Sequence, residues 1–180
     1  MIMQHIIMVL HQYLISDANW STQVDIALYS DACGVGWGGI LNNQHYCYGL
    51  WSERDLSTYT GPKSLKMSAL ELLALGNVLT TFGKAQLLKR MKINIWCDNT
   101  AAVQALRSGT CRDQTLMSIA RSMHHIASLY DFEFRIEHVA GVQNVYADML
   151  SRQLIAQFKQ DCKTANQHAT PTHLLLLHDW

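Results

Sequence analysis

The sequence predicts an α/β fold in which helices cover a mixed five-stranded sheet. Two observations lead to this prediction. Alternation of apolar and polar residues, which is typical of strands, begins at residues 24–32, and two further strand-like stretches follow within residues 34–52. Later strands are separated by stretches of helical periodicity. The early strands are joined by connections too short for a crossover, so they should form an antiparallel meander. The two later strands, each reached through a helix, should be parallel.

The elements of the first half follow from this pattern. Residues 24–32 alternate as a strand, and residues 34–41 and 45–52 continue it on either side of a turn-like "NNQ". Residues 53–63 contain Gly-Pro and are expected to be a loop. Residues 64–82 place leucines at helical spacing, which predicts a long helix.

The second half begins with "INIWCDNTAAVQAL", an apolar strand that ends abruptly at Asp98 and leads into a helix ending at Gly109. An amphipathic helix over 113–130 and an alternating strand over 132–140 should follow. A turn at "GVQN" then leads to a final helix over 145–158. The expected organisation is a helical lead-in over 1–23, one domain over 24–158 and a poorly ordered tail over 159–180.

The composition is that of an intracellular globular protein. Its 180 residues are 49% hydrophobic and 16% charged, which excludes a disordered chain. Fourteen basic and fourteen acidic residues cancel, which excludes a strongly basic nucleic-acid module and requires any such partner to be held by a local patch. The five cysteines are odd in number and lack C-x-x-C spacing, so we expect reduced, mostly buried thiols.

No secretion or membrane signal is predicted. The apolar start of the chain lacks a basic segment and a small-residue cleavage site, so it does not resemble a signal peptide. No run of apolar residues is long enough to span a bilayer. We therefore expect the protein to act in the cytoplasm or nucleus, without a membrane partner.

Four carboxylates are candidate functional groups: Asp31, Glu71, Asp98 and Asp148. Each has an ordinary explanation when taken alone. Asp31 could serve a turn, Asp98 a helix cap and Asp148 a helix dipole, while Glu71 could lie on a solvated helix face.

Their joint placement favours a metal site. Two acids close neighbouring strands and so project from the same edge of the sheet, and helices packed on the sheet can add one carboxylate each. Such a group repels itself unless cations bind, and hard oxygen ligands favour Mg²⁺ or Mn²⁺. A pair of these ions suits hydrolysis of a phosphodiester.

Four segments resemble, in order, the motifs of the type 1 ribonuclease H family: "YSDACGVGWGGIL", "SALELLAL", "CDNTAAVQAL" and "GVQNVYADMLSR". Their wording is most similar to the ribonuclease H domains of retrotransposon reverse transcriptases, including elements that integrate by tyrosine recombinase. The resemblance spans about residues 24 to 155.

The resemblance implies a ribonuclease H-like fold and hydrolysis of the RNA strand of RNA–DNA hybrids. Asp31, Glu71, Asp98 and Asp148 would be the catalytic residues and would bind two Mg²⁺ ions, with Mn²⁺ as a substitute. The expected partners are the hybrid and a reverse transcriptase or polymerase domain, in the same chain or another.

Two asparagines complete the predicted site as substrate-binding residues. Asn99 resembles a substrate-contacting asparagine of the family, and a helix-cap role is equally open for it. Asn144 is expected to cap the last helix and so to hold Asp148 in position.

The chain also departs from cellular members of the family. Those members carry a histidine in the loop before the last helix, where this chain reads "AGVQN", and an evident basic protrusion is missing. Slow turnover is therefore one expectation. Other nucleases of the same superfold fit less well, because their acids have a different order. A catalytically weak or inactive domain that binds nucleic acid beside a polymerase is the non-enzymatic alternative.

Overall fold

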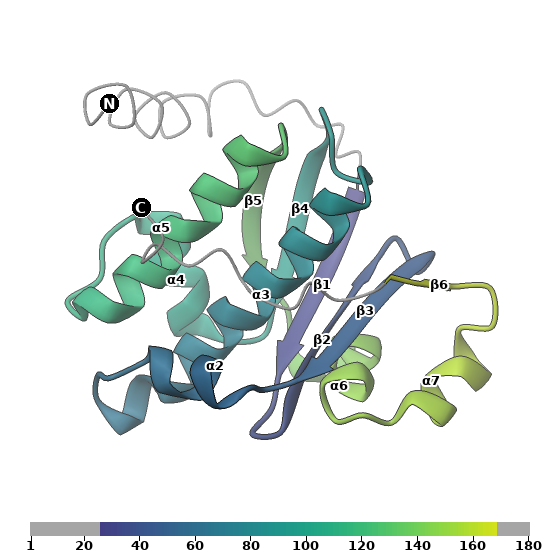
Figure 1. Ribbon diagram of the computed structural model, residues 1–180, viewed down its shortest axis with the longest axis horizontal. Coiled ribbons are helices and arrows are strands. Elements are labelled where there is room, and N and C mark those ends of the chain that lie inside the picture. Colours follow the sequence, from purple (N-terminus) through teal and green to yellow (C-terminus); the bar gives the residue numbers. More distant parts are fainter. Residues whose placement is uncertain (1–25, 169–180) are drawn as a thin grey trace.

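The computed structural model describes residues 26–168, and a six-stranded sheet forms its centre (Figure 1). The strand order is β5-β4-β1-β2-β3-β6. β1 and β2 pair antiparallel, as do β2 and β3, whereas β4 runs parallel to both β1 and β5. The predicted meander with two added parallel strands is therefore confirmed, and a sixth strand extends it.

The meander consists of β1 (Ile26–Ala32), β2 (Gly36–Leu41) and β3 (His45–Leu50). Asn42 and Asn43 connect β2 to β3 with positive φ angles of 49° and 56°. Asparagine tolerates this left-handed conformation better than most residues, and two such residues in succession produce the tight turn that right-twisted strands require.

The parallel half of the sheet consists of β4 (Lys92–Cys97) and β5 (Glu133–His138), connected by α4 (Thr100–Ser108) and α5 (Gln114–Leu129). α4 ends at Gly109, whose φ of 61° is the left-handed conformation that glycine adopts without strain. Helix α4 begins two residues after Asp98, with Asn99 as its cap, and ends where the sequence predicts.

Helix α3 (Lys66–Lys84) is the central helix of the domain. Every residue from Ser68 to Gly83 is buried, because α3 contacts the sheet on one side and α4 and α5 on others. The stretch Lys63–Lys84 has the length and apolar composition of a membrane span, but 83% of its most apolar window is buried within the domain. A core helix has the same composition, so burial explains the apolar residues.

Helices α3 and α6 (Val145–Ser151) cover opposite faces of the sheet. Two successive glycines of β2 show this. A Cβ atom at Gly39 would lie 2.5 Å from a methyl carbon of Val78 in α3, and one at Gly38 would lie 2.3 Å from Cβ of Leu150 in α6. Because successive side-chain positions of a strand point to opposite faces, each glycine allows one helix to approach the sheet closely.

The segment after β3 is not a continuous loop as predicted. It forms helix α2 (Glu53–Thr58) and a 3-10 turn, η1 (Lys63–Leu65). Ser52 and Asp55 form a capping box at the start of α2, in which each side chain bonds to the backbone of the other. This "SERD" pattern was the available sequence signal for the helix.

The predicted final helix over 145–158 is two helices, α6 and α7 (Ile155–Asp161). Gln153 has a left-handed φ of 61°, and the Gln153 and Leu154 amides donate to the carbonyls of Leu150 and Met149. These are the hydrogen bonds of a Schellman termination. Glycine is the usual residue there, so glutamine gave no signal of a helix end.

The boundary predicted at residue 159 also needs correction. α7 continues to Asp161, and β6 (Asn166–Gln167) pairs in parallel with β3. The expectation of a poorly ordered tail therefore does not hold for residues 159–168. Residues 169–180 and the predicted lead-in over 1–23 lie outside the described residues.

The five cysteines all fall within the described residues, and none forms a disulfide. The prediction of free thiols is confirmed. Only Cys47 and Cys97 are buried, however, and the other three are half-buried, so the expectation of mostly buried thiols was too strong.

We expect Gly38→Ala to lower the free energy of unfolding by about 2 kcal/mol or more, since overpacking typically costs 1–3 kcal/mol. The new methyl group would meet Leu150 at 2.3 Å and the Ser151 amide nitrogen at 2.8 Å. Gly34→Ala is the matched control, because a Cβ there would have no neighbour within 4 Å. Urea unfolding of both variants tests this, and equal stabilities would contradict the proposed packing of α6.

Candidate active site

Two of the four candidate carboxylates lie where neighbouring parallel strands end. Asp31 is the penultimate residue of β1, and Asp98 directly follows β4. β1 and β4 are parallel, hydrogen-bonded neighbours, so both side chains lie at the same edge of the sheet, where the carboxyl ends of these strands meet. Asp31 is 4% exposed, whereas Asp98 is only partly buried.

Glu71 reaches this edge from helix α3, on one face of the sheet. It is 4% exposed, and the Cys97 thiol lies 3.9 Å from its Oε2 atom as a hydrogen-bond donor. Possible ligand atoms of Glu71, Cys97 and Asp98 all lie within 4.8 Å of one another. The alternative in which Glu71 lies on a solvated helix face is therefore excluded.

Asp148 approaches from helix α6, on the opposite face. Its carboxylate accepts a hydrogen bond of 2.7 Å from Nε of Arg152, one helical turn later, and the two side chains are partly exposed. Burial is the main reason that the pKa values of Asp31 and Asp98 are raised, and the Asp148 charge adds to both shifts.

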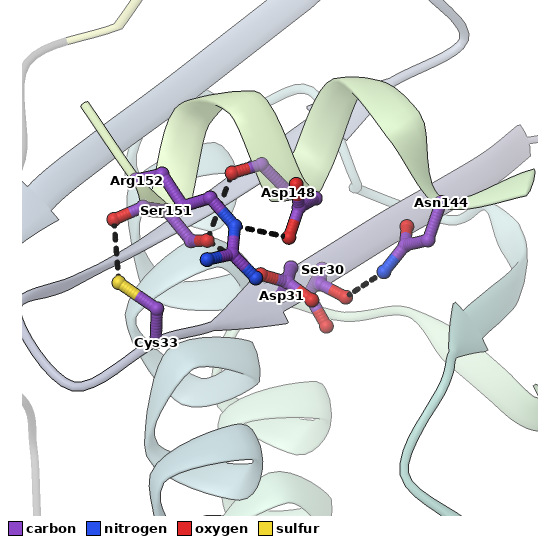
Figure 2. Close-up of polar contacts among 7 residues, drawn as sticks. All are labelled: Ser30, Asp31, Cys33, Asn144, Asp148, Ser151 and Arg152. Carbon is purple, nitrogen blue, oxygen red and sulfur yellow. Dashed lines mark hydrogen bonds and ion pairs between the residues drawn. The ribbon is translucent and has the colours of Figure 1, made fainter. Parts of the chain in front are cut away.

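Contacts between α6 and β1 fix the arrangement (Figure 2). The Ser151 hydroxyl donates to Oδ2 of Asp31 at 2.5 Å, and the Asn144 side-chain amide donates to the Ser30 carbonyl at 3.0 Å. The Cys33 thiol donates to the Ser151 carbonyl at 3.1 Å. Hydrogen bonds at the start and at the end of helix α6 thus connect it to β1 and to Cys33, which follows β1.

The local electrostatics disfavour the ionised acids. Burial, opposed by the Ser151 hydrogen bond and assisted by the Asp98 and Asp148 charges, raises the pKa of Asp31 to about 6. Burial and the charges of Asp31 and Asp98 raise the pKa of Glu71 to about 9. Burial also raises the pKa of Asp98, and nearby His138 partly opposes this. The site lacks enough positive charge for its carboxylates.

The residues present fit a divalent cation. They supply several hard carboxylate oxygens from four separate elements, which is the donor set that Mg²⁺ and Mn²⁺ prefer. Among the described residues, Arg152 is the one cation hydrogen-bonded to any of the four acids, and it pairs with the most exposed side of the group. Asp31, Glu71, Asp98 and Asp148 would hold the ions.

The two predicted asparagines have different roles. Asn99 caps α4, because its Oδ1 accepts a 3.0 Å hydrogen bond from the Ala102 amide, and substrate contact stays a prediction for this residue. The predicted cap by the Asn144 side chain is wrong. Asn144 occupies the residue before α6 but makes no side-chain cap bond, and at 1% exposure it contacts β1 instead. Its burial fits a structural role better than substrate contact.

Sequence reasoning missed the residues that support the carboxylates, namely Cys97, His138, Ser151 and Arg152. Ser151 and Arg152 were within a quoted motif, three and four residues after Asp148, so the helical period placed them on the same face of α6. Cys97 pairs with His138 across β4 and β5. That proximity depends on strand order and had no sequence signal.

Comparisons with known proteins support the fold. No family model and no curated protein matches the sequence significantly. Among solved structures, LC11-RNase H1 in complex with an RNA/DNA hybrid is similar with a TM-score of 0.52 and 19% identity, over 73% of this chain and 97% of that one. RNase H1 from Halobacterium salinarum is similar with a TM-score of 0.51 and 15% identity, over 73% of this chain and 98% of that one.

A second structure of LC11-RNase H1, a protein isolated from compost by a metagenomic approach, gives a TM-score of 0.52 at 18% identity, over 75% of this chain and 98% of that one. The chain thus has the α/β fold of ribonuclease H1 proteins. The meander, the parallel strands and the helices flanking the sheet agree with the predicted fold, although the sheet has six strands instead of five.

We expect Asp31→Asn to stabilise the metal-free protein at pH 8. The pKa of Asp31 is higher in the folded state, about 6, than its ordinary value of 3.8. The folded state therefore binds more protons between these values, and stability falls as pH rises through this window. One pKa unit corresponds to about 1.4 kcal/mol, so the gain should be about 1–3 kcal/mol.

Urea unfolding in EDTA at pH 4 and pH 8 measures this effect. Glu133→Gln is the control, because Glu133 is an exposed carboxylate on β5 with no part in the cluster. Loss of stability in the Asp31 variant at pH 8, or an equal gain in both variants, would contradict the crowding of buried carboxylates.

Proposed function

We propose that this protein is a metal-dependent endoribonuclease that hydrolyses the RNA strand of RNA–DNA hybrids with two Mg²⁺ ions. The observation that carries the proposal is that four carboxylates, from β1, α3, the residue after β4 and α6, influence one another electrostatically where β1 and β4 end in a ribonuclease H fold. The complex of LC11-RNase H1 with an RNA/DNA hybrid supports the choice of substrate.

The residues of this chain have distinct tasks in such a reaction. Buried Asp31 and Glu71 would hold cations deep in the site, and Asp98 and Asp148 would do so nearer the surface. Bound Mg²⁺ ions would activate water and stabilise the leaving oxygen of the phosphodiester. Arg152 holds the Asp148 carboxylate, and the Ser151 hydroxyl holds Asp31. Recognition of the 2′-hydroxyl would distinguish RNA from DNA.

A role in retroelement reverse transcription is part of the proposal, and the amino-acid sequences of the four motifs support it. The ribonuclease would then act inside the cell, beside a polymerase domain in the same chain or another. Equal numbers of basic and acidic residues support the need for such a partner, because the chain can neutralise few phosphates by itself. Five free cysteines are consistent with a reducing compartment.

We expect the wild-type chain to cleave an RNA–DNA hybrid with Mg²⁺ and to lose that activity in EDTA. Asp31→Asn and Asp98→Asn should reduce cleavage below detection, because each removes a cation ligand. Asp148→Asn should be milder, since this carboxylate is partly exposed and paired with Arg152. Initial rates on labelled hybrid, double-stranded RNA and double-stranded DNA measure these effects.

Glu133→Gln, with its exposed side chain on β5, is the control and should cleave like the wild type. Near-normal cleavage by folded Asp31→Asn or Asp98→Asn protein would refute the assignment of the site. Hybrid binding without any metal-dependent cleavage would instead support the weak or inactive nucleic-acid-binding domain.

We also expect the isolated chain to bind hybrids weakly. Each neutralised phosphate contributes about 0.9 to the slope of log affinity against log salt on B-form DNA and somewhat less on single strands, and we expect a slope equivalent to about two to four contacts. Fluorescence anisotropy at several salt concentrations measures it, with the catalytically blocked Asp98→Asn protein. Adding a polymerase domain should lower the hybrid concentration for half-maximal rate more than it raises the maximal rate. Tight, steeply salt-dependent binding would contradict this.

A further inference from the structure

The hydroxyl of Ser151 reaches Asp31 because helix α6 packs closely on the sheet. Ser151 is the last residue of α6 and is fully buried, and its Oγ atom lies 2.5 Å from Oδ2 of Asp31 and 3.0 Å from the Asp148 carbonyl oxygen. A hydroxyl donates its one proton to one acceptor at a time, and a carboxylate oxygen is a stronger acceptor than a carbonyl oxygen, so Asp31 is the main acceptor. The hydroxyl thus connects helix α6, which carries Asp148, to Asp31 of β1.

The strand partner of Asp31 explains how Ser151 reaches it. Gly38 lies directly opposite Asp31 in the β1–β2 pairing, and its missing side chain leaves room for the backbone of Leu150 and Ser151. At the other end of α6, Asn144 bonds to the Ser30 carbonyl, and the Cys33 thiol bonds to the Ser151 carbonyl. Residues 30, 31 and 33 are therefore each bonded to one short helix (Figure 2).

This contact has a chemical consequence for Asp31. A carboxylate has two oxygens, and a buried one that can rotate offers them to a cation in several orientations. A hydrogen bond to Oδ2 restricts rotation of the group and uses one lone pair of that oxygen, so Oδ1 keeps both of its lone pairs for a cation. Partners that orient metal ligands in this way typically contribute 10-fold to 100-fold to metal affinity.

We propose that Ser151 is a positioning residue for metal binding, which orients Asp31 through its hydroxyl; this inference rests on the proposed function. Ser151 touches neither substrate nor cation in this assignment. It acts through Asp31, and the same helix turn carries Asp148, so one short helix supplies a ligand and orients another. The purely structural alternative is that the hydroxyl only holds α6 on the sheet.

The test compares Ser151→Ala with Ser122→Ala in the full 180-residue chain. Ser122 is a matched control, because it is a buried serine of α5 whose hydroxyl donates to a carbonyl of its own helix, Ile119, at 2.6 Å. Calorimetry with Mn²⁺ measures metal affinity without any substrate. The shift of melting temperature on adding Mn²⁺ provides a second measurement, and hybrid cleavage at varied Mg²⁺ provides a third.

We expect Ser151→Ala to weaken Mn²⁺ binding and to raise the Mg²⁺ concentration for half-maximal cleavage by about tenfold or more. The maximal rate at saturating Mg²⁺ should fall much less. Ser122→Ala should leave metal affinity unchanged. Ser151→Thr keeps the hydroxyl and should restore affinity to within about threefold of the wild type, on the same scale. Ser151→Cys replaces the hydroxyl with a somewhat larger thiol, which is a weak donor, and should bind the metal as poorly as alanine.

Unchanged metal affinity in folded Ser151→Ala or Ser151→Cys protein would overturn the proposal, even if stability fell. If the alanine variant does not fold, the cysteine and threonine variants decide the outcome. A wild-type chain that binds Mn²⁺ but cleaves no hybrid would refute the proposed function, and calorimetry would still test Ser151. A wild-type chain that binds no divalent cation would overturn both.

Discussion

The burial and crowding of carboxylates is the constraint on which the rest of this structure depends. Glu71 and Asp31 are almost fully buried, and burial together with neighbouring carboxylate charges disfavours the ionised form of both. Such an arrangement is costly unless surrounding contacts hold it or a cation neutralises it. The sheet, the core helix α3 and the hydrogen bonds of α6 together oppose this repulsion.

The two glycines of β2 determine how closely the helices approach the acids. Gly39 admits α3 on one face, and Gly38 admits α6 on the other. Without either close approach, Glu71 and Asp148 would lie farther from the strand ends that carry Asp31 and Asp98. The "GWGG" segment therefore matters for the site although none of its residues is a metal ligand. Its contribution is the space that it leaves.

Much of the fold was predictable because local patterns dominate there. Strand-like patterns identified the first five strands, with period-two alternation clearest in β1 and β5 and an apolar run marking β4. Helical periodicity identified α3, α4 and α5. Predictions failed where a local signal was weak or ambiguous. The capping box of α2 lies in a segment whose Gly-Pro pair predicts a loop, and the end of α6 is marked by glutamine instead of glycine. β6 is too short to show alternation and depends on its pairing with β3.

The sequence by itself determined the candidate carboxylates and the elements that carry them, because strand ends and helix positions follow from short-range periodicity. The tertiary structure alone decided which groups surround those acids. Ser151 meets Asp31 across 120 residues of sequence, and Asn144 bonds to Ser30 instead of capping its own helix. Such contacts depend on the distance between a helix and a sheet, which packing sets and no local pattern records.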